Sequence, residues 1–188
     1  MWWRKPRPTW RGLARLAVVF AAAGFAAGCF EPLYGTRPSV NAESVRDKLA
    51  AIDIPPIKAQ QGSPVERIAV GMNNALRFDL NGGAAANAPT HRLVVNLGTT
   101  QWTVVIDHVS GRPSAQIASV VANYQLIEIA TNKVVVKDST FAHVDYDIPG
   151  VEQRFAKQRA QRDAEDRAIQ VVAETIRDRL ASYFVAGT

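Results

Sequence analysis

The chain has little cysteine and no long hydrophobic run, and each absence excludes a class of protein. Cys29 is the single cysteine among 188 residues, which excludes an internal disulfide framework and any metal site built from several cysteines. The longest apolar run, residues 16–27, has 12 residues. A helix that spans a bilayer needs about 20, so the sequence predicts no permanent transmembrane helix.

A net positive charge is also absent from most of the chain, although the formal net charge of the whole chain is +5. Five of the 22 basic residues and none of the 17 acidic residues lie in residues 1–28, which leaves 17 of each sign in residues 29–188. A neutral chain without an aromatic–basic motif is a poor candidate for binding nucleic acid. We therefore predict no nucleic-acid partner.

Residues 1–28 have the layout of an export signal. A basic segment, residues 1–15, precedes the apolar run, and small residues stand directly before Cys29. Small residues fit the pocket of a peptidase, and a thiolate is a strong nucleophile for accepting a lipid. The alternative is that Cys29 is a buried free cysteine at the end of an ordinary core helix.

This segment resembles a bacterial lipoprotein signal, although Ala26 stands where such signals usually carry leucine. The resemblance implies that residues 1–28 are cleaved off and that Cys29 receives a diacylglycerol and an N-acyl chain such as palmitate. Residues 29–50 would then be a lipidated tether that holds the protein to a membrane. Phe30, in place of aspartate, implies the outer membrane.

Two helices are predicted in the rest of the chain. Ser63 and Glu66 predict a capping box, Pro64 suits the first helical position, and Gly82-Gly83 ends the helix. Its apolar stripe consists of Val65, Ile68, Ala69, Met72, Ala75, Leu76 and Leu80. A second helix is expected over residues 152–184, and we interpret its charged first half, residues 154–167, as a solvated surface. A short helical turn is expected at residues 44–50.

Four strands complete the prediction. A short one near Pro55-Pro56 should lie at an edge or stop there, since proline lacks an N–H donor. Long strands are expected at about residues 93–106, 115–129 and 134–146, with a bulge at residues 98–101 that returns Trp102 to the face of Leu93. Short turns predict an antiparallel meander. The fold class is α/β (α+β): residues 51–188 form one two-layer sandwich, with two helices on one face of a roughly four-stranded, mostly antiparallel sheet.

No catalytic motif is present, and the three histidines are scattered. His143, Asp145 and Asp147 alternate along a strand, which is typical of a solvated outer face. We predict no enzyme activity, no catalytic or metal-binding residues and no cofactor. The alternative is a periplasmic enzyme that uses His143 and its acidic neighbours.

Residues 29–35, with the sequence CFEPLYG, resemble the start of mature lipopolysaccharide (LPS)-assembly lipoproteins of the LptE family. Pro32, Leu33, Tyr34 and Gly35 match, whereas the glycine that often follows the cysteine is missing. Chain length and element order are also similar. The resemblance implies a non-enzymatic outer-membrane lipoprotein that faces the periplasm, plugs the LptD β-barrel, binds LPS and assists its insertion. The alternative is an accessory lipoprotein of another envelope lipid-transport complex.

An LPS site needs a few cations beside apolar surface, because LPS carries phosphates next to acyl chains. The candidates lie mostly at strand ends. Arg112 is in the turn at residues 107–113, Lys133 and Lys137 flank the next turn, and Arg92 is expected beside Trp102. The alternative for each is a solvent-exposed charge at a sheet edge.

Overall fold

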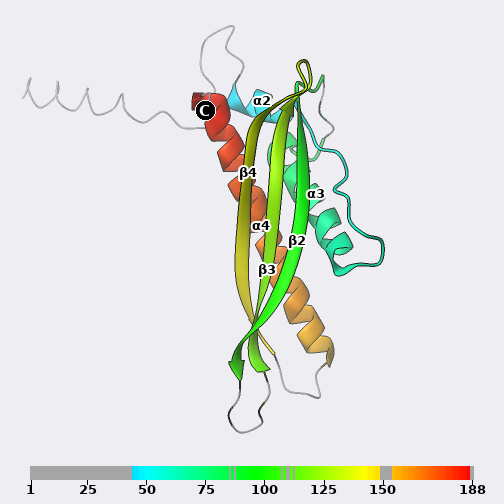
Figure 1. Cartoon of the computed structure of the whole chain (residues 1–188), viewed down its shortest axis with the longest axis vertical. Coiled ribbons are helices and arrows are strands. Elements are labelled where there is room, and N and C mark those ends of the chain that lie inside the picture. Colours follow the sequence, from blue (N-terminus) through cyan, green and yellow to red (C-terminus); the bar gives the residue numbers. More distant parts are fainter. Residues whose placement is uncertain are drawn as a thin grey trace, which may run out of the picture. The chain divides into compact units, whose positions relative to one another are not determined.

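The computed structural model describes residues 44–84, 86, 88–106, 108, 111, 113–148 and 154–186 (Figure 1). The predicted signal at residues 1–28, Cys29 and most of the tether therefore lie outside the described residues, as does Arg112. The elements follow in the order α2 (Val45–Ala50), β1 (Ile52–Asp53), α3 (Pro64–Asn81), β2 (His91–Ile106), β3 (Pro113–Glu128), β4 (Lys133–Asp147) and α4 (Arg154–Ala186).

The four strands form one sheet in the order β1-β2-β3-β4. Neighbouring strands β2, β3 and β4 are antiparallel, as expected for a meander, whereas β1 is parallel to β2. The three long strands have 16, 16 and 15 residues, but β1 has two. Pro55-Pro56 follows β1 almost at once, and the missing N–H donors prevent the pairing from continuing.

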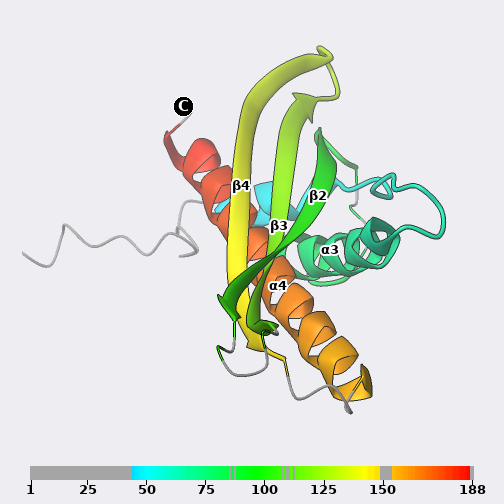
Figure 2. The same ribbon diagram turned by 60° about the horizontal axis from the view of Figure 1, so that its bottom comes forward.

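Helices α3 and α4 cover one face of the sheet and leave the other face open (Figures 1 and 2). The core lies between the two layers, and its fully buried large side chains include Ile68, Met72, Leu76, Leu93, Val120, Leu126, Val172, Ile176 and Leu180. Burial of each such side chain contributes about 1.5–3 kcal/mol. The predicted fold class, a two-layer sandwich of helices on a mostly antiparallel sheet, is confirmed.

The starts of the two shorter helices differ in their capping. At α2, the Ser44 hydroxyl accepts the Asp47 N–H, and the Asp47 carboxylate accepts the Ser44 N–H. Ser63 is the N-cap of α3, but its side chain makes no capping bond, and the Glu66 carboxylate instead accepts the Gly62 N–H at 2.7 Å. The capping box predicted for α3 is therefore wrong in both halves, because Glu66 accepts from the residue before the N-cap.

Three side chains on one side of α3 hold the helix against the chain that leaves β1. Asn73, Arg77 and Asn81 donate to the carbonyl oxygens of Pro55, Ile54 and Ile52 at 3.0, 3.1 and 3.1 Å. Residues four apart lie above one another on a helix, so the three donors form a single row. They satisfy carbonyls of a segment that soon leaves the sheet.

The predicted bulge at residues 98–101 is wrong. Pairing between β2 and β3 runs without interruption from His91 to Thr103, and the irregularity lies between Thr103 and Ile106. Strict alternation therefore places Trp102 on the face opposite Leu93. The inward positions near it are held by Thr99 and Gln101, and Gln101 meets a polar partner on α4 rather than an apolar core. Apolar periodicity alone points to the wrong face here.

Candidate functional site

The open face of the sheet is the candidate site. It carries the even-numbered residues of β2 and the odd-numbered residues of β3 and most of β4, because cross-strand partners share a face. One end of this face is cationic and rich in amides, and we call it the cationic end. It contains Arg92, Asn96, Asn123, Gln125 and Lys137. Trp102, Phe141 and His143, which we call the aromatic cluster, lie farther along the same face.

At the cationic end, Lys137 lines a shallow hollow together with Asn96, Asn123, Tyr124, Gln125, Asp138 and Ser139. Within the part of the chain that the structure describes, Lys137 forms no ion pair, and the neighbouring Asp138 pairs with Arg179 on α4 at 3.5 Å. Exposed amide groups beside an unpaired ammonium can bind an anionic oxygen without first breaking a salt bridge.

Arg92 shares this face with Lys137. Its guanidinium donates to the Asp53 carboxylate at 2.9 Å, so part of its charge is neutralised by β1. Arg92 stands opposite Ile127, and Lys137 stands opposite Gln125, two residues along β3. Since β3 separates the two, their backbones lie about 10 Å apart in the sheet. The structure thus brings two of the predicted cations together around the amide groups.

The structure places Lys133 away from this face and separates Arg92 from Trp102. Lys133 is the cross-strand partner of Glu128. Glu128 is two residues from Leu126 on β3 and shares its face, so Lys133 also lies on the side of the sheet that faces the helices. Trp102 is ten residues beyond Arg92 on β2, about 33 Å along the strand. The expectation that Arg92 lies beside Trp102 is therefore wrong, because the strand continues without a reversal between them.

The aromatic cluster joins β2 and β4 across β3. The rings of Trp102 on β2 and His143 on β4 are edge to face, with centroids 5.3 Å apart, and Phe141 lies 4.8 Å from His143. Beneath this contact, Ser119 on β3 is fully buried although it belongs to the open face, and its hydroxyl has no partner. Trp102 remains 47 % exposed and Phe141 61 %. The cluster is an exposed apolar surface of the kind that marks contacts with partners.

His143, Asp145 and Asp147 are exposed on β4, as the alternation predicts. The His143 ring contacts two aromatic rings rather than either carboxylate. Among the described residues, no three His, Cys, Asp or Glu side chains gather closely enough to hold a metal ion. The arrangement is that of a binding surface.

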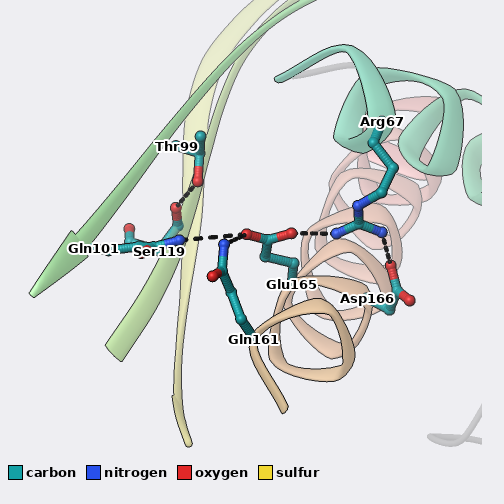
Figure 3. Close-up of polar contacts among 7 residues, drawn as sticks. All are labelled: Arg67, Thr99, Gln101, Ser119, Gln161, Glu165 and Asp166. Carbon is teal, nitrogen blue, oxygen red and sulfur yellow. Dashed lines mark hydrogen bonds and ion pairs between the residues drawn. The ribbon is translucent and has the colours of Figure 1, made fainter. Parts of the chain in front are cut away.

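A buried polar link fastens the helices to the sheet, and the sequence reading missed it (Figure 3). Arg67 on α3 binds both Glu165 and Asp166 on α4, the latter at 2.6 Å. Glu165 is 4 % exposed and also accepts from Gln161 at 2.8 Å and from Gln101 on β2 at 3.5 Å. The interpretation of residues 154–167 as a solvated surface is therefore wrong for Glu165. Ile169 and Val172 lie four and seven residues after Glu165, and this spacing predicts that Glu165 shares their buried face of the helix.

Burial also shifts the titration of three rings near the sheet. The pKa of Tyr124 is raised to about 12 by burial and by the charge of Asp138. Burial and the charge of Glu165 raise the pKa of Tyr146, whose hydroxyl donates to Gln116 at 2.8 Å. Burial lowers the pKa of His91, whose ring packs edge to face on Phe184. Both tyrosines thus remain neutral donors at physiological pH.

Comparisons with known proteins agree with this architecture. The profile of the family described as "LptE: Lipopolysaccharide-assembly" matches residues 49–180. A search of curated protein sequences finds no match. Among the described residues, no helix is long and apolar enough to cross a membrane.

Two crystal structures have a similar fold. A candidate lipoprotein from Caulobacter crescentus CB15 has a TM-score of 0.59 at 18% identity, over 76% of this chain and 96% of that chain. The rare lipoprotein B from Shewanella oneidensis has a TM-score of 0.50 at 14% identity, over 71% and 96%. At these identities the likeness establishes the fold.

Proposed function

The chain belongs to the LptE family of lipopolysaccharide assembly, and from that premise we propose that it is an outer-membrane lipoprotein that binds and plugs the LptD β-barrel. In this role it assists LPS assembly and insertion without enzymatic activity. The observation that carries the proposal is the open face of the sheet. Described residues leave it uncovered, and it offers both a cationic end and an aromatic cluster to partners.

LPS contact is proposed at the cationic end. Phosphate groups would meet Lys137 and Arg92, with Asn96, Asn123 and Gln125 as donors between them. Lys133 points toward the helix side, so we expect it to contribute less. Arg112 lies outside the described residues and stays a candidate on the sequence alone.

Alanine substitution tests this assignment. Lys137→Ala should weaken binding of purified LPS by the mature chain about three- to tenfold, since it removes an unpaired cation. The matched control is Lys157→Ala on α4, an exposed lysine away from the open face, which should leave binding unchanged. Equal losses in both variants would show that the cationic end holds no specific site.

The membrane anchor is proposed to be the lipid on Cys29. Several acyl chains bind stably because each buried methylene contributes about 0.8 kcal/mol. Mass spectrometry of the mature N-terminus should show cleavage before Cys29 and the added mass of the diacylglycerol and N-acyl groups. An uncut chain with a free thiol would remove the basis for the outer-membrane assignment.

The barrel partner is tested by affinity purification after extraction in mild detergent. We expect LptD to be recovered with the tagged chain. Recovery of an ABC transporter or a substrate-binding component in its place would favour the accessory role in another lipid-transport complex. Recovery of neither would contradict the proposal.

A further inference from the structure

Among the described residues, the outer edge of β2 beyond Arg92 has no neighbouring strand, and we propose that an extended, uncharged segment of the barrel partner adds to it as a further β-strand. The inference rests on the proposed function and specifies which part of this chain the partner contacts. Strand addition at an exposed edge is a general mode of recognition in which backbone hydrogen bonds supply affinity.

The edge is free because β1 is so short. β1 pairs only with His91 and Arg92, and the prolines at positions 55 and 56 end the pairing there. On an antiparallel strand, every second residue directs its N–H and C=O away from the neighbour. No hydrogen bond from another described residue outside β2 and β3 reaches the backbone of residues 94–106. About half of the N–H and C=O groups of residues 94–106 therefore have no hydrogen-bond partner among the described residues.

This edge also lacks the features by which proteins prevent strand addition. Residues 93–106 contain no charged residue and no proline, whereas edges that must stay unpaired usually carry lysine, proline or an inward charge. The last six residues, 101–106, are exposed throughout, and Val104, Val105 and Ile106 are 55, 48 and 54 % exposed. β-Branched and aromatic residues dominate this segment, which is typical of strands that pair readily.

The opposite edge of the sheet, formed by β4, is protected against strand addition. β4 carries five charged residues, which are Lys133, Lys137, Asp138, Asp145 and Asp147. α4 also packs against β4, where Arg167 donates to the Asp145 carbonyl at 3.5 Å and Arg179 pairs with Asp138. The chain therefore blocks one edge and leaves the other available.

The composition of the edge specifies its occupant. An uncharged strand adds without desolvating a charge, and exposed valine and isoleucine side chains favour β-branched or aromatic neighbours on the added strand. A segment inside a barrel partner has a second reason to pair, because its own backbone groups need hydrogen bonds wherever water is excluded. The occupant we assign is therefore an extended, uncharged segment of the barrel protein.

Hydrogen exchange followed by mass spectrometry tests the inference. The mature chain is measured alone at two concentrations and then in complex with the barrel protein. In the isolated chain, the amides of residues 94–106 that face away from β3 should exchange quickly, and in the complex about tenfold or more slowly; the amides paired with β3 should be slow in both. Peptides from β4 should change much less, since that edge is already protected.

Paired substitutions locate the effect on one edge. Val105→Lys places a charge on the β2 edge and should weaken the complex about tenfold, whereas Val105→Thr keeps an uncharged β-branched residue and should retain it. Val134→Lys is the matched control, since Val134 is 43 % exposed on β4. It should leave the complex intact. Equal weakening by both lysines would contradict the inference.

The remaining outcomes are distinct. Slow exchange of all amides of residues 94–106 in the isolated chain at low concentration, including those that face away from β3, would mean that the chain's own residues cover the edge. Protection that appears only at high concentration would mean pairing between two copies. Fast exchange in a stable barrel complex would overturn the strand addition and leave the proposed function standing. If no barrel complex forms, the proposed function and this inference fail together.

Discussion

At the scale of single residues, the most consequential group is the buried carboxylate of Glu165. It is 4 % exposed, and it is held by Arg67 and two glutamine side chains (Figure 3). A buried charge is costly without a partner, so arrangements of α3, α4 and β2 in which Glu165 loses these contacts are penalised. Arg67, at 38 % exposed, can still be solvated when its partner is lost.

This asymmetry predicts unequal effects of removing each partner. Arg67→Met should lower the free energy of unfolding by about 2–3 kcal/mol, because it leaves the Glu165 carboxylate buried and unpaired. Glu165→Gln should cost about 1 kcal/mol, since an amide keeps most hydrogen bonds and the guanidinium can turn to water. Urea denaturation measures both.

A double variant and an exposed pair provide the controls. Arg67→Met combined with Glu165→Gln should cost less than the two single effects added together. Arg167→Met removes an exposed i,i+4 pair with Asp163 and should cost about 0.3–0.5 kcal/mol. If Arg67→Met costs no more than Arg167→Met, the buried link has no special role.

His91 predicts a dependence of stability on pH. Because burial lowers its pKa in the folded state, the unfolded chain binds more protons between the folded pKa and the unfolded pKa of about 6.5. The contribution of the neutral ring is complete above the unfolded pKa and is lost as pH falls through the folded pKa. Between pH 7.5 and 5, His91→Phe should show a shallower loss of stability than the parent chain. Identical slopes in urea titrations would contradict this assignment.

At the scale of elements, Gly71 lies at a close contact between α3 and α4. A Cβ atom at this position would meet the Cδ1 atom of Ile169 at 3.1 Å, which is tighter than ordinary contact. Glycine in a helix interior is less favourable than alanine by about 0.8–1 kcal/mol. The glycine is therefore retained at a cost to the helix because it allows close approach to the other helix.

The two opposing effects predict coupling between positions 71 and 169. Gly71→Ala should change stability little in the parent chain, because the gain in helix propensity is offset by crowding of Ile169. In an Ile169→Val background, which lacks Cδ1, the same change should stabilise the protein by about 0.5–1 kcal/mol. Thermal or urea unfolding of the four proteins measures the coupling. Equal effects in both backgrounds would show that Ile169 is not the obstacle.

Elements were the most predictable level of this protein, and the reasons are physical. Apolar spacing, Pro64 and Gly82 identify α3 because they report local geometry, and the short turns identify the meander. The face of Trp102 was mispredicted because polar Thr99 and Gln101 occupy inward positions, where Gln101 meets Glu165. Apolar periodicity cannot show a buried polar contact between distant segments.

The site was less predictable than the fold. Placing Arg92 and Lys137 on one face requires the register of two strand pairs, and the inward direction of Lys133 follows from an irregularity in β4 that its sequence does not mark. The free edge of β2 could be read in part from its uncharged run, since Pro55-Pro56 already limits the strand beside it. Predicting that edge in full also requires the order of the strands in the sheet, which the sequence does not supply.

At the scale of the whole molecule, the balance of charge predicts how LPS association responds to salt. Residues 29–188 carry 17 basic and 17 acidic residues, so no long-range positive field attracts a polyanion. Only the local cations would respond to screening. Raising ionic strength from about 0.05 to 0.3 M should therefore weaken LPS binding by the mature chain less than about tenfold. A loss of a hundredfold or more would indicate a broad basic surface and contradict this view.

The place of α4 after the three long strands has a consequence for how the protein is made. α4 supplies one side of the core opposite β3 and β4, and it also packs on α2 and α3. The part of the inner face that α4 covers therefore stays exposed until α4 itself, a helix of 33 residues, has been synthesised. Any product that ends before α4 would expose the same surface permanently, and we expect it to be removed by proteases or to aggregate.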